Sequence, residues 1–163
     1  MGKIAAIDAD GHVTESTEQL AEYIDPAYRD YGAMGGHRGY YSSDGWDRSV
    51  RGTLGVPAGD AKTWLEAMDR GGLETAVLYP TAGLGIGWVR EPDLAVALCR
   101  AYNDFFHQEF MLKNPRFTGV ALLSLQEVPE AVKELRRARE LGFVGAMLPA
   151  VGLRKPLGPQ AFW

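Results

Sequence analysis

Short apolar runs recur along the chain, separated by segments whose hydrophobic positions have helical spacing. The apolar runs lie at residues 4–7, 75–79, 117–123 and 143–148. They do not alternate with polar residues, which is typical of strands buried on both faces of a parallel sheet. The helical segments lie at residues 16–24, 61–70, 92–113 and 129–141. This alternation predicts an α/β fold, with a parallel sheet covered by helices.

The apolar faces of the two long helices predict which side chains reach the core. In the segment that begins at Pro92, the expected stripe is Leu94, Leu98, Ala101, Phe105 and Leu112. In the segment that begins near Pro129, the expected inward positions are Val128, Val132, Leu135 and Ala138. The outer face of this second helix is expected to carry ion pairs, among them Glu134–Arg137.

Composition adds one unusual feature, a long glycine-rich segment. The chain has 163 residues and 20 glycines, and eight of these glycines lie between Gly32 and Gly59. We interpret residues 32–59 as an irregular insertion in a single domain over residues 1–163. The net charge of −4 argues against a nucleic-acid partner, and the single cysteine excludes a disulfide scaffold. Without an apolar run long enough for a membrane helix, a cytoplasmic protein is expected.

The number of strand–helix units indicates half of a larger barrel. A complete (β/α)₈ barrel needs about 250 residues, and a sheet of only four parallel strands leaves two unpaired edges. The apolar end at residues 161–163 has nothing after it to bury it. We therefore expect the N-terminal half of a TIM barrel, although a small doubly wound domain would fit the length better.

Asp10 and His12, just after the first apolar run, are candidate metal ligands. In an extended segment their side chains point the same way. A carboxylate and an imidazole suit zinc, manganese or iron, and Gly11 between them would let a ligand approach the backbone closely. From the spacing alone, an acidic turn that caps the following helix is the simpler interpretation.

Other polar or glycine-rich positions have ordinary structural interpretations. Residues 83–87 follow the second strand and predict a substrate-facing loop, since their spacing does not match a dinucleotide-binding motif. His107 shares a helix face with Asn103 and is expected to be solvated or paired with Asp104. Cys99 is expected to be a small buried hydrophobic residue.

The run IDADGHVTE at residues 7–15 resembles the opening metal motif of the amidohydrolase superfamily. It is most similar to the amidohydrolase-related branch, which includes aminocarboxymuconate-semialdehyde decarboxylase and the resorcylate decarboxylases. RAYNDFF, the following NPRFTGVALLSLQEVPEAVKEL and then LGFVGAMLPA are similar to the third strand, the next helix and the fourth strand of that branch. The resemblance covers nearly the whole chain apart from the glycine-rich segment.

The resemblance implies a distorted TIM barrel with one catalytic divalent metal, held in part by Asp10 and His12. Many members of the superfamily have His-x-His at this motif, so Asp-x-His leaves the identity of the metal open, with zinc expected first and manganese second. The other ligands, a His after the fifth strand and an Asp after the eighth, and the catalytic residues are expected downstream of Trp163. The side chains that would neutralise a substrate carboxylate are Arg38, Arg48 or Arg51.

Two reactions and one non-enzymatic role remain open. The branch favours non-oxidative decarboxylation of an aromatic or unsaturated carboxylic acid. Metal-dependent hydrolysis of an amide or lactone on the same scaffold is the alternative, and an inactive fragment or interaction module is the third. The expected partner is a small-molecule carboxylic acid, amide or lactone, without nucleic acid or membrane, and a homo-oligomer is left open.

Overall fold

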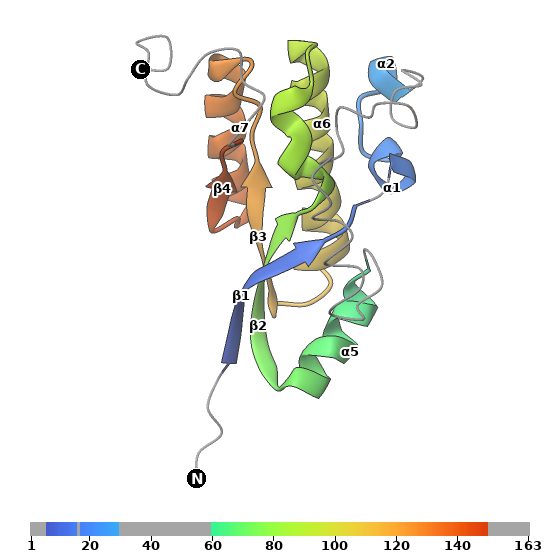
Figure 1. Ribbon diagram of the computed structural model, residues 1–163, viewed down its shortest axis with the longest axis vertical. Helices are drawn as coiled ribbons and strands as arrows, with labels where there is room; N and C mark the ends of the chain where they lie inside the picture. Colours follow the sequence, from blue (N-terminus) through green and yellow to red (C-terminus); the bar gives the residue numbers. More distant parts are fainter. Residues whose placement is uncertain (1–5, 16, 30–59, 150–163) are drawn as a thin grey trace.

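A computed structural model of the chain describes residues 6–15, 17–29 and 60–149, which form a parallel four-stranded sheet with helices packed against it (Figure 1). The strands are β1 (Ala6–Val13), β2 (Leu73–Pro80), β3 (Phe117–Leu122) and β4 (Gly145–Met147). Their order in space is their order in the chain, and neighbouring strands are parallel. Parallel neighbours require crossover connections, which here contain the helices. The predicted α/β architecture with four parallel strands is confirmed.

The helices begin and end at the signals that the sequence provides. α5 (Ala61–Gly71) begins after Asp60, whose side chain accepts a hydrogen bond from the Thr63 N–H at 2.7 Å, and ends at Gly72 with a φ of 67°. α7 (Val128–Leu141) ends in the same way at Gly142, with a φ of 96°. The other helices are α1 (Thr17–Ala21), α2 (Pro26–Arg29), the 3₁₀-helix η1 (Ala82–Trp88), α6 (Pro92–Phe106) and the π-helix η2 (His107–Met111). Within the described ranges, none is long and apolar enough to cross a membrane.

β1 differs from the predicted first strand in its extent. The sequence predicts a strand over residues 4–7, whereas β1 runs from Ala6 to Val13. Its pairing with β2 continues to its last residue, with register irregularities along the way. Because this pairing keeps polar residues in an extended conformation, Asp10 and His12 lie within the strand rather than after it.

The long predicted helix changes type before it ends. α6 begins at Pro92 as predicted, but from His107 the chain continues as the π-helical turn η2. A π-helical turn holds one residue more than an α-helical turn, so side chains beyond it are rotated by about 100° from their α-helical positions. Phe110 is therefore fully buried, and Leu112, predicted to face the core, is 62% exposed. The other positions of the predicted stripe are buried.

Aromatic rings from α6, η2 and β3 form the centre of the core. Phe106 stacks on Phe110 with ring centroids 5.0 Å apart, and Phe110 meets Phe117 edge to face at 5.5 Å. Gly119 faces the same rings, and a Cβ atom at this position would lie 2.4 Å from the ring of Phe106. The lack of a side chain at Gly119 therefore lets β3 approach the aromatic cluster.

α7 buries only part of the predicted face: Ala138 is buried as predicted, but Val132 and Leu135 are not. Its buried residues are Ala131, Glu134 and Ala138. Val132 and Leu135, which were predicted to point inward, are 40% and 46% exposed. Glu134 lies inside instead because its carboxylate has partners there: Asn103 donates to it at 2.7 Å, and Arg137 donates from two nitrogens at 2.7 and 2.9 Å. The predicted Glu134–Arg137 pair thus forms, but with its acidic member in the interior.

Asn103 links α6, β3 and α7 through one buried amide. Its Nδ2 donates to the Leu122 carbonyl at 3.0 Å, and its Oδ1 accepts from the Leu122 N–H at 2.8 Å. The same Nδ2 donates to Oε1 of Glu134 at 2.7 Å. The amide therefore satisfies both backbone groups at the end of β3 and one carboxylate oxygen, none of which can rely on bulk water.

Replacing Asn103 by Leu is expected to lower the free energy of unfolding by about 2–4 kcal/mol, because buried polar groups of Leu122 and Glu134 lose their partner. Urea denaturation, compared at equal m values, measures the change. Gln108→Ala, an exposed position in η2, is the control and should change the same quantity by less than about 0.5 kcal/mol. Equal midpoints for the two variants would contradict the role assigned to Asn103.

Candidate active site

The candidate site lies where β1 and β2 end. Parallel strands place their carboxyl ends at one edge of the sheet, and ligand-binding residues of parallel α/β proteins gather at that edge. His12 of β1 pairs with Tyr79 of β2, and their rings stack with centroids 5.9 Å apart. Thr81 follows β2 directly and places its hydroxyl 3.4 Å from Nδ1 of His12. These residues form a corner between the first two strands.

Asp10 and His12, the predicted metal ligands, lie side by side on β1. Oδ1 of Asp10 is 4.0 Å from Nε2 of His12. The Asp10 side chain is 88% exposed, whereas that of His12 is only 11% exposed. The N–H of Asp10 donates to Oδ1 of Asp8 at 3.0 Å, so Asp8 engages the backbone of the strand. The pair thus combines an accessible carboxylate with a largely enclosed imidazole.

The surroundings of His12 favour its neutral form. Burial lowers its pKa from the ordinary value of 6.5, and Asp10, a hydrogen bond to the Pro80 backbone and Asp8 offset this only in part. Proline has no N–H, so in this bond the ring donates and the Pro80 carbonyl accepts. A neutral imidazole that donates through one nitrogen offers the lone pair of the other for metal binding.

Gly11 serves packing rather than ligand access. It is buried, and a Cβ atom there would lie 2.5 Å from Cδ2 of Leu78 and 3.0 Å from the ring of Trp64. The prediction that Gly11 opens the backbone to a ligand is therefore wrong, because its face of β1 lies against β2 and α5. Asp10 and His12 belong to the opposite face of the strand.

Glu15 is the residue of this corner that the sequence did not single out. It lies just after β1 and is 2% exposed. Its Oε1 accepts a hydrogen bond from the Gly83 N–H at 2.7 Å, and its Oε2 accepts one from the Thr81 N–H at 3.0 Å. Burial raises the pKa of Glu15 to about 7, although the backbone N–H donors act in the opposite direction. Only its place at the end of the IDADGHVTE run pointed to it.

Residues 83–87, for which the sequence predicts a substrate-facing loop, form part of the 3₁₀-helix η1. All three glycines of the segment are buried. Glu15 accepts hydrogen bonds at its start, and Nε2 of Gln126 donates to the carbonyls of Ile86 and Val89 at 2.8 and 3.0 Å near its end. Because the Glu15 and Gln126 side chains form hydrogen bonds with its backbone, the segment packs as a short helix.

His107 is half-buried in η2, and the prediction of a solvated residue or a partner of Asp104 is wrong. Asp104 pairs with Arg137 instead. Nδ1 of His107 is buried without a hydrogen-bond partner among the described residues. Cys99 is buried as predicted, and this burial raises the pKa of its thiol.

The glycine-rich segment is not part of the site that can be described. The predicted carboxylate-binding residues Arg38, Arg48 and Arg51, and residues 32–59 as a whole, lie outside the described residues. Their assignment remains a prediction.

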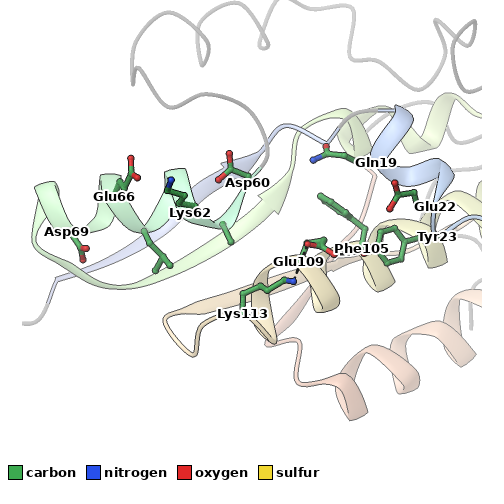
Figure 2. A pocket seen from close by; sticks show the side chains of 12 residues that line it. Gln19, Glu22, Tyr23, Asp60, Lys62, Glu66, Asp69, Phe105, Glu109 and Lys113 are labelled. Carbon is green, nitrogen blue, oxygen red and sulfur yellow. Dashed lines mark hydrogen bonds and ion pairs between the residues drawn. The ribbon is translucent and has the colours of Figure 1, made fainter.

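A cavity of about 750 Å³ lies among the helices of the chain. Residues of α1, α5, α6 and η2 line it (Figure 2). Inside it the Tyr23 hydroxyl donates to Oε1 of Glu109 at 2.7 Å, and Nζ of Lys113 lies 3.7 Å from the other oxygen of Glu109. Neither Asp10 nor His12 lines this cavity, so it is separate from the candidate site.

Asp10 and His12 would provide only part of a metal site. No group of three or more His, Cys, Asp or Glu side chains in the described ranges is placed to hold a metal ion. Protein metal centres of the catalytic type use about three protein ligands. The donor types of the pair suit a divalent ion, and the rest of the ligand set would have to come from outside the described ranges.

Comparison with known proteins relates the chain to decarboxylases of aromatic acids. No family model matches it. The gamma-resorcylate decarboxylase of Rhodococcus jostii (strain RHA1) is 38% identical over 85 residues, which are 52% of this chain and 26% of that protein. The match thus spans about half of the chain and about a quarter of the relative.

Solved structures superpose on most of the chain. A dihydroxybenzoic acid decarboxylase from Polaromonas sp. JS666, solved with manganese and the inhibitor 2-nitroresorcinol, has a TM-score of 0.65 and 24% identity, covering 98% of this chain and 44% of that one. An amidohydrolase from Mycobacterium avium subsp. paratuberculosis K-10 has a TM-score of 0.60 and 17% identity, covering 88% of this chain and 48% of that one. The chain therefore spans less than half the length of these structures.

The resemblance to the amidohydrolase superfamily is confirmed, since the relatives and structural neighbours of the chain are members of it. The parallel α/β sheet matches neighbours with the TIM-barrel fold of that superfamily. The partial coverage fits the N-terminal half of such a barrel.

Glu15 is expected to make the folded state less stable as the pH rises. Its pKa is raised from 4.5 to about 7 on folding, so the folded state holds this proton more tightly than the unfolded state. The resulting stabilisation is complete below pH 4.5 and is lost as the pH rises through about 7. The difference in unfolding free energy between wild type and Glu15→Gln, measured by urea denaturation in metal-free buffer, should therefore fall over this interval.

Glu130→Gln is the control for this measurement, because a hydrogen bond from Lys133 lowers the pKa of the Glu130 carboxyl. Its titration lies below the interval, so its difference from wild type should stay constant there. A constant difference for Glu15→Gln as well would contradict the raised pKa of Glu15.

Proposed function

We propose that the protein to which these strands belong is a metal-dependent decarboxylase of aromatic carboxylic acids. The observation that carries the proposal is the Asp10–His12 pair at the end of β1 in a chain related to gamma-resorcylate decarboxylase. A structural neighbour over nearly the whole chain is a dihydroxybenzoic acid decarboxylase solved with manganese. Further strands of a (β/α)₈ barrel would supply the remaining ligands and the acid that protonates the substrate carbon.

Asp10 and His12 would hold the ion through Oδ1 and Nε2. Each donor binds a metal such as zinc at about 2.0–2.2 Å, so two donors of one ion lie no more than about 4.4 Å apart. The 4.0 Å between these atoms is within that limit, and the exposed Asp10 side chain would move slightly closer to Nε2 to reach the tetrahedral angle of a zinc site. The lowered pKa of His12 supports the same role, because only the neutral imidazole can bind a metal ion.

A divalent ion bound at this corner supplies Lewis acidity toward the oxygens of a hydroxy acid. The chain itself contributes an exposed carboxylate at Asp10, which limits the positive charge of the site, and a neutral donor at His12. Tyr79 stacks on His12 and provides an aromatic surface next to the pair, which suits a substrate with an aromatic ring.

The substrate carboxylate would need a positive partner beside Asp10. We assign this role to one of Arg38, Arg48 and Arg51 in residues 32–59, within a barrel domain that includes residues 1–163. Support comes from the sequence alone, where these arginines lie among glycines and aromatic residues between the first two strands. The bidentate guanidinium group is well suited to bind a carboxylate.

Hydrolysis of an amide or lactone is the second candidate reaction. It is supported by the fold that the chain shares with an amidohydrolase. Release of carbon dioxide from gamma-resorcylate, measured alongside hydrolysis of lactone and amide substrates by the full-length protein, separates the two reactions. Hydrolysis without carbon dioxide release would replace the decarboxylase proposal.

The donor set and the comparisons support a divalent metal ion without distinguishing zinc from manganese. The imidazole nitrogen of His12 suits zinc, and the carboxylate oxygens of Asp10 suit manganese. Zinc is the ion expected from the sequence, whereas a structural neighbour was solved with manganese. Metal analysis of the purified full-length protein, followed by reconstitution with each ion, decides between them.

Asp10→Ala and His12→Ala are each expected to abolish carbon dioxide release by the full-length protein and to reduce its bound metal to a small fraction of the wild-type amount. The Asp10 side chain is 88% exposed, so Asp10→Ala should change thermal unfolding little, whereas His12→Ala also removes the stacking on Tyr79 and should lower the unfolding midpoint. Asp8→Asn is the matched control, because its amide oxygen can still accept the hydrogen bond from the Asp10 N–H. Unchanged metal stoichiometry in both alanine variants would mean that the ligands lie elsewhere.

A further inference from the structure

Glu15 connects the end of β1 to the first turn of η1 from a position without solvent access. Its two carboxylate oxygens accept separate hydrogen bonds, from the N–H groups of Thr81 and Gly83. The Thr81 N–H also donates to the Val13 carbonyl at 3.0 Å, so this backbone group is held by both the last residue of β1 and Glu15. The position of Thr81 relative to β1 is therefore set by β1 and the residue just beyond it.

Gly83 lets the first turn of η1 come close enough for these hydrogen bonds. A Cβ atom at Gly83 would lie 2.8 Å from Cδ2 of Leu122 and 2.8 Å from Cβ of Pro80. A side chain would push this turn away from β2 and β3, and with it the N–H that Glu15 binds. The first turn of η1 is thus held between the Glu15 carboxylate and the ends of β2 and β3.

Thr81, at the start of this turn, carries the hydroxyl that faces His12. Thr81 is 2% exposed, and its Oγ1 lies 3.4 Å from Nδ1 of His12. Nε2, on the other side of the ring, lies 4.0 Å from Oδ1 of Asp10. Because ring orientation decides which nitrogen meets Asp10, the placement of Thr81 bears directly on the donor atom that a metal ion would meet.

We propose that Glu15 is a positioning residue, which acts through Thr81 to orient the His12 ring so that Nδ1 faces the Thr81 hydroxyl and Nε2 faces Asp10. This inference rests on the proposed metal-binding function of Asp10 and His12. It adds a buried layer behind that pair. Glu15 fixes the backbone of Thr81, Thr81 fixes the ring together with the Pro80 carbonyl, and neither Glu15 nor Thr81 binds the ion. Groups that hold a metal-binding histidine in this way ordinarily affect metal affinity by about 10–100-fold.

A purely structural role for Glu15 makes a different prediction. If Glu15 only held η1 in place, its loss would lower stability without changing which ring nitrogen of His12 carries the proton. The state of the ring is measurable in the metal-free protein from the ¹⁵N shifts of the imidazole nitrogens. These shifts are recorded near pH 8, above the ordinary histidine pKa of about 6.5, and His12→Ala identifies the signals of His12.

Three variants of the full-length protein test the proposal: Glu15→Gln, Thr81→Val and Thr81→Ser. Glu15→Gln replaces one accepting oxygen by a donor, so one of the two backbone hydrogen bonds is lost. Thr81→Val removes the hydroxyl at constant shape and leaves the Thr81 N–H bound to Glu15, so it serves if Glu15→Gln does not fold. Thr81→Ser keeps the hydroxyl and should restore wild-type behaviour. Glu130→Gln, in a surface pair with Lys133, is the carboxylate control.

In Glu15→Gln and Thr81→Val, the ¹⁵N shifts of His12 are expected to differ from those of wild type, because the hydrogen bond to the Pro80 carbonyl would then hold the ring without the Thr81 hydroxyl. Affinity for Mn²⁺, measured by competition with a chromophoric chelator, is expected to fall by about 10-fold or more. Thr81→Ser and Glu130→Gln should match wild type in both measurements. Unchanged His12 shifts in Glu15→Gln and Thr81→Val overturn the proposal, whatever happens to metal affinity.

The same experiment distinguishes failure of this inference from failure of the proposed function. If His12→Ala binds Mn²⁺ as tightly as wild type, the metal site is elsewhere and the proposed function fails. The ¹⁵N shifts of the metal-free variants would still report whether Glu15 and Thr81 orient the ring. If His12→Ala loses the metal while the shifts of the other variants stay unchanged, the function stands and the positioning role is rejected.

Discussion

The parallel pairing of β1 with β2 is the interaction on which the rest of this structure depends. It sets His12 opposite Tyr79, and it brings Glu15 within reach of Thr81 and Gly83, more than sixty residues further along the chain. Both the candidate site and the burial of Glu15 follow from this one alignment. A slip of one residue would move every side chain of β1 to the other face, and Asp10 and His12 would leave this corner.

The sequence was sufficient for features that depend on local signals and insufficient for those that depend on tertiary partners. Pro92 and Gly142 mark helix ends by their own backbone preferences, so these boundaries could be predicted. The inward position of Glu134 could not, because it depends on Asn103 and Arg137 in the folded chain. The candidate site divides in the same way. Asp10 and His12 could be predicted because they belong to a recognisable motif. The burial of Glu15 could not, because it depends on hydrogen bonds from the turn that follows β2.

Two glutamates are buried among the residues that the structure describes, and they are stabilised in different ways. Glu134 has the guanidinium of Arg137 and the amide of Asn103, so its negative charge is balanced inside the protein. Glu15 has backbone N–H donors, which solvate the carboxylate without a full opposite charge. Burial raises the pKa of Glu15 to about 7, because these donors offset the loss of solvation only in part. The first glutamate joins helices to the sheet, and the second lies behind the site.

The π-helical turn at His107–Met111 divides the long helical segment into two parts. Side chains after the turn point in other directions than a continuous α-helix would give them. An α-helix that gains one residue must either shift all later side chains around its axis or confine the extra residue to one wide turn. Here the wide turn directs Phe110 into the aromatic cluster and leaves Leu112 at the surface. A single-residue deletion within η2 ahead of Phe110 would remove the wide turn and leave the later side chains in the directions they have now, so Phe110 would stay in the aromatic cluster and Leu112 at the surface.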